Sequence, residues 1–430
     1  MSRGSLEVEN VIFLLRSALN SIKLAIESLG SPVMAVSEVA RQNLTSQQSM
    51  AIEKSFLRRA TALEAQLSLT RKRFSLANSL EALRLLEMDL GYVRDNYFKS
   101  EQVFDYYVDL LHTRSENGVG PLLRGCDQIA IESLKRGLGP LGLDIPAVVC
   151  YLDRGEGASI LRSGIYLWDG ETNPAAIIKV VRSALPLPKL TAILHECGHQ
   201  ATHITEWNKE LETLLYEAII SLGGSRGLAR LWASWVPEIS ADFWALHQSN
   251  FASVVGLSEV VAGSPKRVFR VIPGDPHPMA YLRVMLGLSA CKVGLGNGPW
   301  EDFARAWQLR YPIPEANTES IRIILETMPL LPEISRTISN TKMNAFSGKS
   351  LNEILPWALA SPLVVRSFLN NDHSNFSVST NRLVEQPLVV LTCFRYIQMF
   401  GGRSHEWIVE NMRNWLTSLA LVGDKRGDDK

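Results

Sequence analysis

The chain has 430 residues, of which 46% are hydrophobic and 20% charged, and its 44 basic side chains are balanced by 44 acidic ones. This composition is ordinary for a globular protein. A formal charge of zero argues against nucleic acid or an anionic membrane as the main partner. No apolar run is long enough to span a bilayer, so we expect no membrane span.

The N-terminal residues and the cysteines bear on the cellular compartment of the protein. Glu7 and Glu9 precede the first apolar run, which is unlike a signal peptide. The five cysteines are scattered and include no C-x-x-C pair. This pattern favours reduced thiols over a disulfide framework. We therefore expect a soluble, cytoplasmic protein.

The first quarter of the chain is predicted to be helical. Residues 6–29 carry apolar side chains at alternating spacings of four and three, which is typical of a helix with one apolar stripe. A second long helix is predicted over residues 46–90, with an interruption at Gly91 and a continuation over 95–112. We interpret residues 1–115 as a helical hairpin or bundle. It could be an arm that binds a protein partner, or a packing module for the rest of the chain.

A small β-sheet is predicted next. Residues 146–152 and 163–168 have the composition of strands, and residues 173–182, which begin Asn-Pro, are predicted to form a short helix. An extended peptide can add to the edge strand of such a sheet through backbone hydrogen bonds. Residues 164–168 are the candidate edge, so Gly164, Ile165 and Tyr166 are predicted to bind substrate. An interior strand is the open alternative.

The remainder is predicted to be mostly helical. Helices are expected at 206–222, at 228–250 with a break at Pro237, and at 279–293, with a strand-like stretch at 268–272. Residues 299–422 are expected to be helical, with loops near 312, 347 and 373. The predicted fold class is α+β, mostly α-helical, with domains at 1–115, 116–298 and 299–430.

The pattern H-E-x-x-H occurs at His195, Glu196 and His199. Residues four apart share one face of a helix, so two imidazoles there can bind one metal ion. Zinc suits such ligands, and a neighbouring glutamate can take a proton from water bound to the ion. The motif fixes only three residues and can occur by coincidence. A metal site therefore requires a further ligand from elsewhere in the chain.

The third ligand is predicted to be Glu238. His203 lies a further turn along the helix, which makes the three histidines span about 12 Å, too far for one ion. Glu238 lies in a stretch rich in apolar residues, where a carboxylate without a partner is costly. Asp242, four residues later, is on the same helical face and could hold the other nitrogen of a ligating histidine.

A further part of the site is predicted in the segment GDPHPMAYLRV. His277 lies between two prolines, and Arg283 follows at the start of a helix. The transition state of peptide hydrolysis carries a negative tetrahedral oxygen, which His277, Arg283 or Tyr281 could stabilise. A structural histidine in a turn is the alternative for His277.

The three motifs HECGH, EISAD and HPMAYLRV, in this order, resemble the gluzincin metallopeptidases. The branch most similar contains the CAAX-processing zinc endopeptidases and their bacterial heat-shock relatives, and the resemblance covers about residues 140–295. It implies a zincin-like catalytic core with His195, His199 and Glu238 as zinc ligands and Glu196 as general base. It also implies that Asp242 lies behind a histidine, and that His277 and Arg283 contact the transition state or a substrate carboxyl. The chain departs from that branch in lacking its membrane helices.

We therefore predict a zinc-dependent peptidase acting on peptides or proteins, with Zn²⁺ as cofactor. Two alternatives stay open. One is an inactive zinc-binding scaffold with helical arms for a partner, and the other is a helical interaction protein in which HECGH is coincidental.

Overall fold

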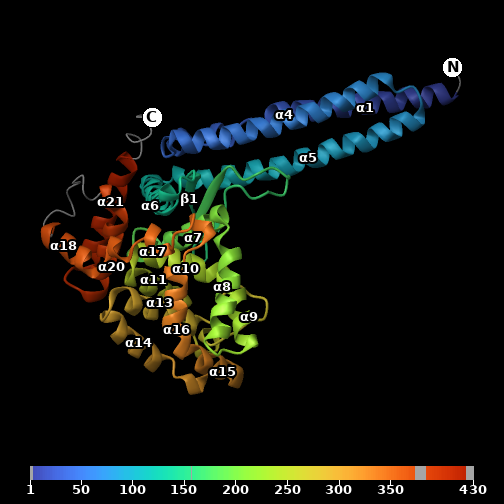
Figure 1. Cartoon of the computed structure of the whole chain (residues 1–430). Helices are drawn as coiled ribbons and strands as arrows, with labels where there is room; N and C mark the ends of the chain where they lie inside the picture. Colours follow the sequence, from blue (N-terminus) through green and yellow to red (C-terminus); the bar gives the residue numbers. More distant parts are fainter. Residues whose placement is uncertain (1–2, 156, 373–383, 423–430) are drawn as a thin grey trace. The chain divides into compact units, whose positions relative to one another are not determined.

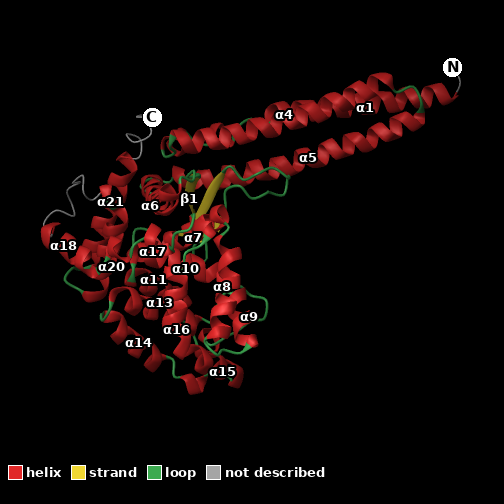
Figure 2. Cartoon of the chain, in the orientation of Figure 1, coloured by secondary structure: helices red, strands yellow, loops and turns green. Residues whose placement is uncertain are grey.

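The computed structural model describes residues 3–155, 157–372 and 384–422. Helices dominate, and one small mixed sheet of three strands accompanies them (Figure 2), which confirms the predicted fold class in its secondary structure. Contacts within the chain divide it into two compact units. Unit 1 comprises Met1–Gly120 and Ser163–Ala175, and unit 2 comprises Pro121–Arg162 and Ala176–Lys430. The three predicted domains stay a prediction.

Unit 1 is built on three long helices, α1, α4 and α5 (Figure 1). Its helices are α1 (Arg3–Ser28), α2 (Pro32–Ala35), α3 (Glu38–Gln42), α4 (Ser46–Leu76) and α5 (Leu80–His112). The apolar stripe of α1, from Leu15 to Ile26, packs against Leu63 and Leu67 of α4 and Leu83 of α5. Burial of these stripes is the main stabilisation of such long helices. The predicted helical bundle is present.

The break between α4 and α5 lies at residues 77–79, so the predicted interruption at Gly91 is wrong. Ser79 caps α5 by accepting a hydrogen bond from the amide of Ala82. Gly91 lies inside α5, between Leu90 and Val93, which are both buried. A glycine in a helix costs only about 1 kcal/mol relative to alanine. The packed stripe outweighs that cost, whereas Asn78-Ser79 offers a ready cap.

Residues 163–175 form a hairpin-like loop, so the predicted strand at 163–168 is wrong. The amide of Gly164 donates to the carbonyl of Asn173 over 2.9 Å, and that of Asn173 to Ile165 over 2.8 Å. Tyr166 and Thr172 form an isolated bridge outside the sheet. The extended residues therefore pair with each other, which satisfies their backbone groups locally. They are not an edge of the sheet.

A buried ion pair holds this loop to the helices of unit 1. Nε of Arg59 lies 2.5 Å from Oδ2 of Asp169, and the two side chains are 0% and 1% exposed. The guanidinium also lies over the ring of Phe56, 5.0 Å from its centroid. The buried hydroxyl of Tyr107 donates to the side chain of Asn173. Polar groups buried in this way require their partners.

The sheet of unit 2 has the strand order β1-β3-β2, with β1 (Ala147–Asp153), β2 (Ser159–Leu161) and β3 (Ala175–Val181). Strand β1 was predicted. Strand β3 replaces the helix predicted at 173–182. All of its residues except Lys179 are buried, so both of its faces are covered. Ile177, Ile178, Val180 and Val181 are β-branched and fit a central strand, which outweighs the Asn-Pro start.

Strand β2 is an edge of this sheet. It pairs only with β3, antiparallel, with Ile160 opposite Ile178. The edge lies a few residues before the predicted one. The short sequence Ser-Ile-Leu gives too few residues for a periodic signal.

The rest of unit 2 is helical. One of its helices, at Gly120–Leu138, was not predicted from the sequence. The helices are α6 (Gly120–Leu138), α7 (Ala192–Thr205), α8 (Trp207–Ser221), α9 (Arg226–Ser234), α10 (Val236–Ser249), α11 (Phe251–Val261), α12 (Pro265–Val268), α13 (Ala280–Leu295), α14 (Pro299–Arg310), α15 (Thr318–Thr327), α16 (Leu331–Asn340), α17 (Leu351–Ile354), α18 (Pro362–Asp372), α20 (Pro387–Phe400) and α21 (His405–Val422).

The predicted helices at 206–222, 228–250 and 279–293 correspond to α8, to α9 with α10, and to α13. Pro237 lies in the first turn of α10, where the missing amide is tolerated. The strand-like stretch at 268–272 is wrong. Ser264-Pro265 is a helix start, so the short helix α12 forms here. It ends at Val268, and a loop follows. The predicted loop near 373 lies outside the described residues. Throughout the described chain, each helix is either too short or too polar to cross a bilayer.

We expect the buried ion pair of unit 1 to be sensitive to truncation. Replacing Arg59 with methionine leaves Asp169 buried without its cation, which should lower the unfolding free energy by about 3–5 kcal/mol. Hydrogen exchange of peptides from α4 and residues 163–175 measures this. The matched control is Arg73→Met, because the pair Arg73–Asp89 is solvated, with Arg73 67% exposed. Its loss should change the free energy by less than about 1 kcal/mol. Equal effects of the two substitutions would contradict the expectation.

Candidate metal centre

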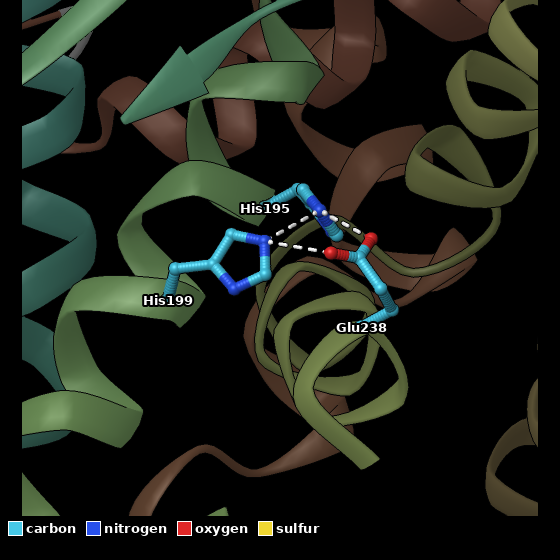
Figure 3. Close-up of side chains that lie close together, drawn as sticks. All are labelled: His195, His199 and Glu238. Carbon is cyan, nitrogen blue, oxygen red and sulfur yellow. Dashed lines mark hydrogen bonds and ion pairs between the residues drawn. The ribbon is translucent and has the colours of Figure 1, made fainter. Parts of the chain in front are cut away.

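Helix α7 presents His195 and His199 on one face. The two Nε2 atoms are 3.1 Å apart, and the rings meet edge to face with centroids 4.7 Å apart. Both side chains are about four-fifths buried, at 18% and 20% exposure. Figure 3 shows the nitrogen atoms turned toward a common point. The helical spacing of four therefore brings the two imidazoles together, as the motif predicts.

Glu238 completes the group from the first turn of α10 (Figure 3). Its Oε1 lies 3.3 Å from Nε2 of His199, and its Oε2 lies 3.4 Å from Nε2 of His195. One possible ligand atom from each of the three residues lies within 4.8 Å of those of the other two. Ions such as zinc, with bonds of about 2.0–2.1 Å at tetrahedral angles, place neighbouring ligand atoms about 3.3 Å apart. These three residues could therefore hold a metal ion.

Close packing of α7 on α10 makes this convergence possible. Gly198 faces α10, and a Cβ at this position would lie 2.6 Å from Cα of Ala241 and 3.0 Å from Cβ of Trp244. Any side chain at residue 198 would push the helices apart. No role was predicted for Gly198 from the sequence. Its place between the two histidines of the motif was the signal that could have revealed one.

Asp242 and Arg283 surround the ligands. Oδ1 of Asp242 lies 2.9 Å from Nδ1 of His195, close enough for an ion pair although not aligned as a hydrogen bond. Arg283 of α13 donates through Nε and Nη2 to both oxygens of Asp242, and its Nη2 is 3.0 Å from Oε2 of Glu238. Both predicted residues are thus at the site. Nη2 of Arg283 also lies 3.5 Å from Nε2 of His195, so the guanidinium contacts the candidate ligand atoms as well as Asp242.

The charges of the site shift its pKa values strongly. Burial disfavours charge on His195, but Asp242 and Glu238 outweigh it and raise the pKa of His195 to about 10 in the absence of a metal ion. Burial also disfavours ionised Glu238. Hydrogen bonds from His195 and His199, together with Arg283, nevertheless hold the pKa of Glu238 far below its usual range. The carboxylate is therefore ready to act as a ligand at neutral pH.

Glu196 lies beside the ligands and lines the same cavity. It is only 6% exposed, and burial raises the pKa of its carboxyl above the usual value, partly opposed by His195 and His199. A carboxylate with a raised pKa accepts a proton more readily than a solvated one. Glu196 is thus a buried carboxyl that lines the cavity next to His195.

His277 also reaches the site. Its Nδ1 lies 2.6 Å from Oδ1 of Asp275, which fixes the ring, and its Nε2 lies 3.6 Å from Oε1 of Glu238. The side chain is 61% exposed, so Nε2 is accessible to a substrate. Asp275 was not assigned a role from the sequence. Its position two residues before His277, which suits a carboxylate that bonds back to the imidazole, was the available signal.

The four predicted substrate-binding residues fall in two different places in the chain. Tyr281 is fully buried and packs against Phe269, with ring centroids 5.2 Å apart, and it does not line the cavity. Gly164, Ile165 and Tyr166 belong to the hairpin-like loop of unit 1. The edge strand that lines the cavity is β2, through Ser159 and Ile160.

A cavity of about 660 Å³ is lined by the three residues that could hold a metal ion. Helices α10, α11 and α13 supply apolar walls, and β2 supplies a strand edge. The volume lies within the range of about 300–1,000 Å³ that is usual for ligand sites. The cavity is thus large enough for a short segment of peptide beside the ligands.

Removing a ligand should abolish metal binding. We expect His195→Ala and Glu238→Ala to lose stoichiometric zinc and the thermal stabilisation that zinc gives. Metal analysis and melting curves with and without zinc measure this. His203→Ala is the matched control, because His203 is on the same helix but outside the ligand group. Unchanged zinc content in the ligand variants would contradict the assignment.

Metal binding should release protons. The pKa of His195 is raised to about 10 without a metal ion, so the imidazole is protonated at pH 7 and has to lose its proton to bind. The apparent zinc affinity should therefore increase with pH between about 6 and 8. Calorimetry in buffers of different ionisation enthalpy measures the released protons. An affinity that is constant over this range would contradict the expectation.

Gly198→Ala should weaken the site without touching a ligand. The added methyl group would meet the backbone of Ala241, so α10 has to move and Glu238 with it. We expect zinc affinity to fall at least about tenfold, the scale seen when groups that orient ligands are changed. Gly227→Ala on α9 is the control, because its Cβ would meet only Ser225, at 3.9 Å. Equal affinities for both variants would show that the close approach is unimportant.

Comparisons with known proteins find no matching family model, no similar curated protein and no similar solved structure. The part of the site that is established is therefore a group of His195, His199 and Glu238 that could hold a metal ion.

Proposed function

We propose that the chain is a zinc-dependent peptidase of the gluzincin type. The observation that carries the proposal is the convergence of two imidazoles and a carboxylate, with buried Glu196 beside them, at the floor of a cavity. Two nitrogen ligands and one oxygen ligand suit zinc and leave a fourth position open. The resemblance of the three short motifs to gluzincins agrees with this arrangement.

Zinc, when bound, would polarise a carbonyl and lower the pKa of a water molecule toward about 7. Glu196 takes the proton of the attacking water and passes it to the amine that leaves. Asp275 fixes the ring of His277 through Nδ1, and the doubly protonated ring would donate a hydrogen bond from Nε2 to the developing oxyanion. Asp242 orients His195, and Arg283 holds Asp242 and Glu238 in place.

Two features favour a peptide over a smaller substrate. The cavity extends well beyond the ligands, and its walls are more apolar than polar. Strand β2 is an edge of the sheet and lines this cavity, so an extended chain could add to the edge by backbone hydrogen bonds. An edge strand beside the metal centre serves an extended polypeptide better than a compact molecule.

The test separates chemistry from metal binding. Glu196→Gln keeps the shape of the site and the zinc but removes the proton acceptor, so peptide hydrolysis should fall by about 10²–10⁴-fold. Cleavage of a peptide library, followed by mass spectrometry, measures turnover, and metal analysis measures zinc.

Glu212→Gln on the exposed face of α8 is the matched control and should cleave like the unmodified chain. Full activity of the Glu196→Gln variant would exclude the mechanism. Stoichiometric zinc without cleavage of any peptide by the unmodified chain would favour a zinc-binding scaffold instead.

A further inference from the structure

The charged residues that line the cavity fall into two groups. Around the metal centre are the carboxylates of Glu196, Glu238 and Asp242 and the guanidinium of Arg283. A divalent ion together with Arg283 matches these three carboxylates in charge. The loaded centre therefore contributes little net charge, and the remaining residues decide the sign of the electrostatic field in the cavity.

The second group is predominantly cationic. It consists of Arg162, directly after β2, and of Arg267 and Arg270, together with Asp275. Asp275 is engaged by the ring and backbone of His277, at 2.6 and 3.0 Å, and its negative charge also interacts with Arg270. The arginines come from two segments distant in the sequence but line one cavity. Positive charge around a cavity attracts and retains anionic ligands.

Arg270 is the arginine best placed to act on a substrate. It is exposed, and it lies on the loop between α12 and α13 that also carries His277. Pro273, Pro276 and Pro278 restrict this loop, and the amide of Asp275 donates to the carbonyl of Ile272 over 3.1 Å. A restricted backbone holds the guanidinium near the cavity at a lower entropic cost. Arg162 and Arg267 also interact with other residues of the chain.

We propose that the substrate of this site is an acidic peptide segment, and that Arg270 binds a carboxylate of that segment, with Arg162 and Arg267 adding to the positive field. The inference rests on the proposed peptidase function for its biological meaning, but not for its test. Guanidinium groups bind carboxylates through paired hydrogen bonds, which gives Arg270 a means of selecting Asp or Glu over Asn or Gln.

Binding is measured first, so that the result does not depend on turnover. The zinc-loaded Glu196→Gln variant of the full chain is titrated with three fluorescent peptide pools of one length, which differ only in carrying Asp and Glu, Asn and Gln, or Lys. We expect the acidic pool to bind about fivefold more tightly than the amide pool, which is the upper end for a solvated ion pair. Raising the salt concentration should reduce this ratio.

Arg270→Ala in the same background should bring the ratio of acidic to amide affinity close to one, and Arg270→Glu should invert it. Arg322→Ala, which removes an exposed arginine of α15 away from the cavity lining, should keep the ratio. Equal affinities of the three pools, or an acidic preference that survives Arg270→Glu, would overturn the inference.

Cleavage by the unmodified chain then separates the two proposals. Faster cleavage of the acidic pool, with a preference that Arg270→Glu inverts, supports both. Cleavage of all pools at equal rates overturns the selectivity of the site and leaves the peptidase proposal standing. An acidic preference in binding without cleavage of any pool supports Arg270 as an anion-binding residue and counts against the peptidase.

Discussion

The site depends on how closely α7 and α10 pack. His195 and His199 are placed by the geometry of one helix, but Glu238 comes from another helix 39 positions further along the chain than His199. Its oxygens reach both imidazoles because Gly198 lets the backbone of α10 lie against α7. The packing continues beyond the site, since Gly137 of α6 leaves room for the ring of Trp244 on α10. Small residues at helix crossings thus set the distances between the ligand atoms.

Charge is the second constraint on the same region. Glu196, Glu238 and Asp242 are largely buried close together, and three carboxylates in one low-dielectric region repel one another. Arg283 compensates two of them directly, with Nη2 3.0 Å from Glu238 and 2.8 Å from Asp242. In the absence of a metal ion, Asp242 and Glu238 stabilise a proton on His195 and raise its pKa to about 10, and this proton supplies a further positive charge. A divalent ion would take over this role, so metal and proton compete for the same negative surroundings.

The contrast between correct and wrong predictions has a physical basis. The helical spacing of His195 and His199 is a local property, and it could be read from five consecutive residues of the sequence. Glu238 and Asp242 were identifiable because a carboxylate in an apolar helix needs a partner. Gly198 was not, because its role depends on the approach of α10, which only the folded chain provides. Gly198 of α7 and Gly137 of the unpredicted helix α6 both lie close to Trp244 of α10, and neither contact could be read from the sequence.

Secondary structure failed where local and tertiary preferences disagree. The segment from Asn173 to Arg182 begins with a helix-start signal, yet it becomes a central strand, because burial on both faces favours its β-branched residues. Gly91 looks like a break, but the stripe from Leu83 to Val93 keeps α5 continuous. In both cases the packed apolar surface contributes more free energy than the local signal. Residue-by-residue propensity cannot anticipate which surface will be covered.

The misplaced edge strand illustrates a third kind of limit, which concerns the path of the chain. After β2 the chain leaves unit 2 at Arg162, folds residues 163–175 within unit 1, and returns inside β3. Two neighbouring strands of one sheet are therefore joined by a segment whose polar groups, Asp169 and Asn173, are satisfied by Arg59 and Tyr107. The extended residues 164–168 have the composition of a strand because they do pair, but only with their own hairpin. Composition reports that a segment is extended, whereas its partner is fixed by distant residues such as Arg59. The role of sheet edge accordingly falls to the three residues of β2, whose sequence is too short to attract notice.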